Sequence, residues 1–68
     1  MTIRDLLDQV EIQGPVSVLE NVEDVNKILY EGYGCYLSKK AKVYLDREIT
    51  YIYPSYQDLG AGVVIEIK

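Results

Sequence analysis

The single cysteine, Cys35, most constrains how this chain can fold. One thiol cannot form an internal disulfide, so the 68 residues must be held together by packing alone. A chain of this length buries only about 60% of the surface that it exposes when unfolded, so its core is small. The sequence therefore predicts one small globular domain, residues 1–68, in which each apolar face is docked on another element.

Apolar residues at helical spacing predict two short helices. The first spans residues 3–9, where Thr2 is suited to cap the amino end and Ile3, Leu6, Leu7 and Val10 repeat along one side. The second spans residues 39–45, with Ser38 as the cap and with Ala41 and Leu45 directed inward. Helices this short are unstable alone, so each is expected to pack on a sheet.

Three segments read as strands, at residues 16–20, 48–53 and 63–67. The middle one is the clearest, because every residue from 49 to 53 is β-branched or aromatic. Pro54 is expected to end it and residues 55–62 to form a turn. The last strand then pairs antiparallel with residues 48–53.

Residues 22–31 admit two interpretations. Asn21 and Asp24 could cap a helix that ends at Gly32, or residues 27–31 could form a strand paired with residues 16–20. The strand is favoured, because the segment at 16–20 needs a neighbour and a hairpin supplies one.

The fold class that these elements predict is α+β, with a small antiparallel sheet of about four strands and one or two short helices. Alternation makes residues 48–53 a central strand covered on both faces, and leaves residues 63–67 as a candidate edge. An uncovered edge tends to pair, so either a monomer or an edge-strand homodimer is expected. The expected core consists of Leu6, Leu7, Val16, Val18, Ile28, Ile49, Tyr51, Val63 and Ile65.

All seven aromatic residues are tyrosine. A buried tyrosine needs a partner for its hydroxyl, so these rings either lie at the rim of a small core or form an interaction surface. Tyr53 and Tyr56 flank Pro54 where the strand is expected to become exposed, and Tyr33 and Tyr36 flank a glycine break. These four tyrosines are the candidate partner-binding residues.

The residues that catalysis and metal binding require are scarce. The chain has no histidine, so Cys35 has no imidazole to deprotonate it and the usual zinc ligand sets are missing. Carboxylates such as Asp5 and Asp8 lie on short exposed elements, where solvation is the ordinary state. The sequence predicts no enzyme, no cofactor and no metal site.

The net charge of −4 disfavours binding to a phosphate backbone. Two nucleic-acid-directed alternatives remain open. Lys39, Lys40 and Lys42 lie close in sequence to tyrosines and could bind a single strand, or the acidic residues of the first half could mimic nucleic acid and inhibit a DNA-handling enzyme.

The sequence also predicts a compartment. Residues 1–9 contain no apolar signal core, and no apolar run approaches the roughly 20 residues that cross a bilayer. With no disulfide expected, a soluble cytoplasmic protein without membrane contact is predicted.

Short motifs at both ends resemble a known group. Thr2-Ile3-Arg4-Asp5-Leu6, Glu11-Ile12-Gln13-Gly14, Arg47-Glu48-Ile49 with Tyr51 and Tyr53, and Ile65-Glu66-Ile67 are similar to a family of short uncharacterised proteins from Gram-positive gut bacteria and their phages or mobile elements. The resemblance implies a strand at residues 27–31 and an accessory or inhibitory binding role. Together with the composition, it leads us to expect a non-enzymatic module that binds an unknown protein partner.

Overall fold

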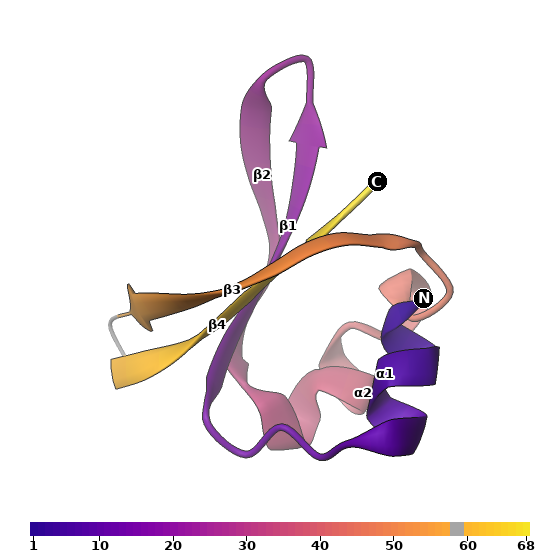
Figure 1. Ribbon diagram of the computed structural model, residues 1–68, viewed down its shortest axis with the longest axis vertical. Helices are drawn as coiled ribbons and strands as arrows, with labels where there is room; N and C mark the ends of the chain where they lie inside the picture. Colours follow the sequence, from indigo (N-terminus) through magenta and orange to yellow (C-terminus); the bar gives the residue numbers. More distant parts are fainter. Residues whose placement is uncertain (58–59) are drawn as a thin grey trace.

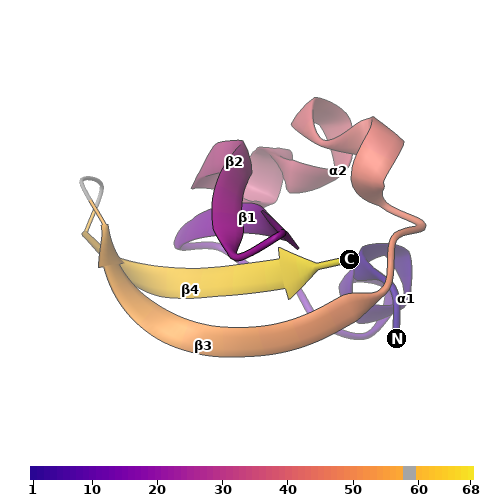
Figure 2. The same cartoon turned by 90° about the horizontal axis from the view of Figure 1, so that it is seen from above.

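The computed structural model describes residues 1–57 and 60–68 (Figure 1). The chain forms one four-stranded sheet with short helical segments packed at one side of it (Figures 1 and 2). In chain order the elements are α1 (Ile3–Gln9), β1 (Pro15–Val22), β2 (Val25–Tyr33), η1 (Gly34–Tyr36), α2 (Leu37–Lys40), η2 (Lys42–Tyr44), β3 (Ile49–Gln57) and β4 (Gly60–Ile67). The predicted α+β class, with four strands and short helices, is confirmed.

Helix α1 begins at the predicted cap. The Thr2 hydroxyl accepts a hydrogen bond from the Asp5 backbone N–H, and the Asp5 carboxylate accepts one from the Thr2 N–H, both at 3.1 Å. These two bonds lower the pKa of Asp5 below its usual value. The helix is attached to the segment before β3, because the Arg4 N–H donates to the Leu45 carbonyl and the Arg4 guanidinium binds Asp46.

Strands β1 and β2 form an antiparallel hairpin, so the strand interpretation of residues 22–31 is confirmed and the helix is wrong. A two-residue turn joins them, and both of its residues, Glu23 (φ 52°) and Asp24 (φ 66°), have the left-handed backbone of a type I′ turn. A type I′ turn matches the twist of the two paired strands, and the positive φ of its residues is incompatible with a helix through this segment.

The sheet consists of two antiparallel pairs, β1 with β2 and β3 with β4, which are joined by pairing of the two central strands, β1 and β4. The strand order is β2-β1-β4-β3, and β1 runs parallel to β4 while the other two pairs are antiparallel. The sheet is therefore mixed, not antiparallel throughout as expected. At the start of the parallel pair a Cβ at Gly62 would lie 2.1 Å from the Pro15 carbonyl oxygen, so only glycine fits there.

The core lies between the sheet and the helical segments. Val16, Val18 and Ile65 are fully buried as predicted, and Leu6, Leu7, Ile49 and Val63 pack against them half-buried. The expected core list omitted Ile3 and Leu37, which the helical segments contribute and which are fully buried. It was wrong for Tyr51 and Ile28, whose side chains are 67% and 60% exposed.

A single extra residue in each outer strand explains these two errors. The pairing of β3 with β4 skips Thr50, so that Ile49 faces Ile67 but Tyr51 faces Glu66. The pairing of β2 with β1 skips Leu29 in the same way. Each bulge reverses the alternation, so Tyr51 and Ile28 lie on the face away from the helices.

Strand β3 is an edge of the sheet, not its centre, and β4 lies inside, which reverses the predicted positions. Pro54 does not end β3, because an edge strand tolerates a residue without an N–H, and pairing continues from Pro54 to Gln57. The predicted turn at 55–62 is therefore wrong for residues 55–57 and 60–62, which belong to strands, and residues 58 and 59 lie outside the described residues.

The second helical region differs from the single helix predicted at 39–45. It begins earlier, at Gly34, and consists of η1, α2 and η2 with a break at Ala41. Ser38 lies inside α2 and does not cap it. Ala41 and Leu45 are nevertheless buried, as predicted.

The turn between β1 and β2 is expected to become more stable when its two residues are replaced. Replacing Glu23 with Asn and Asp24 with Gly supplies the residues that adopt positive φ most readily. We expect the double variant to raise the free energy of unfolding by about 1 kcal/mol in urea titrations. An unchanged or lower value would contradict the left-handed turn.

Replacing Gly34 with any larger residue is expected to destabilise the fold. A Cβ there would lie 2.3 Å from the Ile12 carbonyl oxygen and 2.5 Å from Ile12 Cγ2. Gly34→Ala should therefore lower the free energy of unfolding by about 2 kcal/mol. Gly14→Ala is the matched control, since its nearest neighbour would be 4.0 Å away. Equal stability of the two variants in the same denaturant series would refute the close approach.

Candidate functional site

The sheet face opposite the helices is the main candidate surface, and we call it the open face. The pairing registers arrange its side chains in three rows across the strands in the order β2-β1-β4-β3. Residues paired in a row point to the same side of the sheet. The rows are Ile28–Leu19–Glu66–Tyr51, Glu31–Ser17–Val64–Tyr53 and Tyr33–Pro15–Gly62–Ser55.

In the second and third rows of this face, the two middle strands carry the smaller side chains, and all three tyrosines of the face lie on the outer strands. Val64 is only 6% exposed although no helix among residues 1–57 and 60–68 covers this side. Its row neighbour Tyr53 is 37% exposed, whereas Tyr51 at the end of the adjacent row is 67% exposed. The middle of the open face is thus largely closed to water, since Ser17 is also only 6% exposed, and the exposed area is provided by outer-strand side chains such as Tyr51, Ile28 and Tyr33.

Glu66 lies between two of these rings. It is the cross-strand neighbour of Tyr51, and the hydroxyl of Tyr53 forms a hydrogen bond with its carboxylate. This hydrogen bond, followed by desolvation, raises the pKa of the Tyr53 hydroxyl above its ordinary value, because the bond stabilises the protonated phenol. Glu66 is thus a half-buried carboxylate beside two rings, of which that of Tyr51 is the more exposed.

The four predicted tyrosines are not brought together. Tyr53 and Tyr33 share the open face, but they lie on its two opposite outer strands, β3 and β2. Tyr56 is 88% exposed and belongs to the other side of β3, near the end of the hairpin, while Tyr36 lies in η1 on the helical side. Tyr51, which the prediction placed in the core, is the exposed ring closest to Glu66 in the register.

Tyr30 has a structural role instead. Its hydroxyl donates to the Tyr33 carbonyl at 2.7 Å, and its ring lies over Gly32, where a Cβ would be 2.8 Å from the hydroxyl oxygen. Burial raises the pKa of Tyr30. The ring packs against the core, so this tyrosine is unavailable to a partner.

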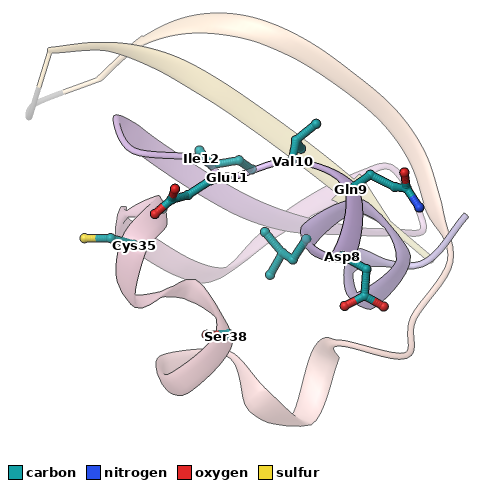
Figure 3. Close-up of a pocket in the computed structure, with 9 residues that line it drawn as sticks. Asp8, Gln9, Val10, Glu11, Ile12, Cys35 and Ser38 are labelled. Atoms are coloured by element: carbon teal, nitrogen blue, oxygen red, sulfur yellow. The ribbon is translucent and has the colours of Figure 1, made fainter.

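A shallow groove of about 500 Å3 is the second candidate. It lies between the end of α1, the following loop and the start of the second helical region (Figure 3). Its apolar wall includes Leu7 and Ile12, and its polar groups include Asp8, Glu11 and Cys35. Figure 3 shows the Glu11 carboxylate on the side where Cys35 lies and the Asp8 carboxylate at the other end.

The groove has few side chains that could take part in catalysis. Cys35 is an exposed free thiol, and the chain has no histidine that could act as its base. Within the part of the chain that the structure describes, no three Cys, Asp or Glu side chains gather closely enough to hold a metal ion. The groove can therefore hold an apolar or cationic group, but it does not contain a paired nucleophile and base.

The lysines form a third, weaker candidate. Lys39 and Lys40 end α2, Lys42 follows in η2, and all three are exposed. Tyr36 is exposed just before them, whereas Tyr44 is half-buried against the core. One free ring beside three cations is a small base-stacking surface.

Fold and surface together define a small α+β protein in which the helical segments of the described residues cover one side of a mixed sheet. No family model matches the chain, and neither the curated proteins nor the solved structures include a significant match to it. In addition, no helix among the described residues has the length and apolarity needed to span a membrane.

The hydrogen bond between Tyr53 and Glu66 can be tested by titration. Tyr53 should ionise above the ordinary tyrosine pKa of 10.0, and Glu66→Gln should lower its pKa toward that value, because the charged acceptor is lost. NMR of 13C-labelled tyrosine rings between pH 8 and 12 would measure both. Glu31→Gln, which removes the other carboxylate of the open face, is the control and should leave the Tyr53 titration nearly unchanged.

Proposed function

We propose that this chain is a non-enzymatic module that binds another protein through its open face. The observation that carries the proposal is the exposure of Tyr51 and Ile28, which two separate bulges turn out of the core and onto one side of the sheet. Tyrosine is enriched at interfaces, since its ring offers a large contact area at a low entropic cost.

The size of the open face limits the partner. Four strands at about 4.8 Å spacing and three rows give a surface of roughly 400 Å2. A stable complex of two globular proteins buries about 800 Å2 on each side. The open face therefore suits a short segment of a partner better than a second folded domain.

Further features support an accessory role of this kind. An exposed free thiol at Cys35 is compatible with a reducing compartment, so we place the module in the cytoplasm. The likeness of both chain ends to short proteins of phages and mobile elements favours an accessory function in such a setting. The groove at α1 lacks a base for Cys35, which favours binding over catalysis.

The lysines of α2 and η2 support a second candidate, binding of single-stranded nucleic acid. Lys39, Lys40 and Lys42 are exposed beside Tyr36 and lie apart from the open face. Binding there would weaken steeply with salt, and a Lys39→Ala, Lys40→Ala variant would lose it. The absence of a mobility shift of single-stranded DNA at low salt would remove this candidate.

Site-specific photocrosslinking tests the proposed module. A benzoylphenylalanine at position 51 should give protein adducts in the native cells, because its ring replaces the most exposed tyrosine ring of the open face. The same residue at position 56 is the control, since Tyr56 is 88% exposed but lies off the open face.

Two results would contradict the proposal. Equal adducts from positions 51 and 56 would indicate unspecific contact. Adducts that form at 51 but persist after Ile28→Ser and Tyr33→Ser would indicate that the partner does not use the face as a whole.

A further inference from the structure

The charged residues in the three rows of the open face have one sign. The rows contain Glu31 and Glu66 and no Lys or Arg, and the first basic residue beyond them on this side is Lys68, two positions after Glu66. The nearest basic residue of β2, Lys27, is paired with Glu20 and belongs to the helix side. The face therefore attracts cations and repels anions.

These two carboxylates are also without an internal cation. The side-chain ion pairs of the described residues join Arg4 to Asp46 and Arg47 to Glu20. Neither Glu31 nor Glu66 takes part in an ion pair in that part of the chain. Both remain available to a charged group from outside.

The surroundings of Glu66 favour one kind of cation. A guanidinium that binds this carboxylate would lie beside the exposed ring of Tyr51, which is directly opposite Glu66 on the neighbouring strand. Arginine is suited to such a position, because its planar group binds a carboxylate with two N–H donors and stacks on an aromatic ring. The compact ammonium of lysine is more strongly hydrated and has no plane to stack.

The positions of the two carboxylates set a spacing. Glu31 on β2 and Glu66 on β4 are two strands and one row apart, which is about 12 Å for a sheet of ordinary dimensions. Residues four positions apart in an extended segment point to the same side and are separated by about 13 Å.

We propose that the partner segment on the open face carries two arginines, four residues apart, one bound by Glu66 beside Tyr51 and the other by Glu31. This inference rests on the proposed function, because it specifies which chemistry the same face recognises. It adds a sequence requirement that protein binding alone does not impose.

Peptides of about ten residues test it directly on the full chain. The first carries two arginines four positions apart in an otherwise uncharged sequence, and two further peptides carry lysine or glutamine instead. NMR titration at low salt should show shifts at Tyr51, Tyr53 and Glu66 with the arginine peptide, weaker shifts with lysine and none with glutamine. Equal affinities for arginine and lysine would overturn the role of the ring.

Variants of the chain measure how much each residue of the open face contributes to binding of the arginine peptide. Glu66→Gln and Glu31→Gln should each weaken binding of the arginine peptide about threefold. Tyr51→Ser should weaken it further, whereas Tyr51→Phe should preserve it, because the ring face is retained. Glu11→Gln changes the charge equally but in the groove, so it is the matched control and should have little effect. An equal loss with Glu11→Gln would show general charge attraction and refute the site.

The two proposals can fail separately. Loss of both the crosslinks at position 51 and the peptide shifts would refute both. Crosslinks that depend on the open face, together with no shifts from the arginine peptide, would leave the binding module in place and refute the arginine requirement.

Discussion

The whole structure depends on the parallel pairing of β1 with β4. Each hairpin is local in the chain, and this pair is what joins the two into one sheet. It requires the close approach of Gly62 to Pro15, and it brings Val18 beside Ile65 at the centre of the core. A two-stranded hairpin is marginally stable alone, so neither half is expected to persist without the other.

Two bulges then decide which side chains meet water. Without the extra residue Thr50, alternation from Ile49 would direct Tyr51 toward the helices, and without Leu29 the same would hold for Ile28. The bulges keep the core filled, since Ile49, Leu29 and Tyr30 all pack against it. They also transfer an aromatic ring and an aliphatic side chain to the open face, which links the local backbone to the proposed binding surface.

Local patterns predicted the elements well, because their causes are local. The capping box of Thr2 and Asp5, the helical spacing of Leu6 and Leu7, and the run from Ile49 to Tyr53 each lie within a few residues. Strand order and register depend on contacts between segments that are distant in the chain. The sequence therefore predicted β3 as a central strand and the sheet as antiparallel throughout, whereas β3 is an edge strand and β1 runs parallel to β4. Single-residue bulges leave no mark in periodicity, and for that reason Tyr51 was assigned to the core. Tyr53 and Tyr33 were found as exposed rings, but their neighbour Glu66 emerged only from the register.

The uniform charge of the open face has a consequence for the behaviour of the molecule in a crowded solution. If two copies approached each other through this side, Glu31 and Glu66 of both would meet over an apolar centre, where repulsion between carboxylates is screened least. The outer strands offer no easier route, because Pro54 removes one N–H from the β3 edge and the bulge at Leu29 distorts the β2 edge. The same two glutamates, which form no ion pair among the described residues, would thus oppose association of two copies through this apolar surface until a cation binds them.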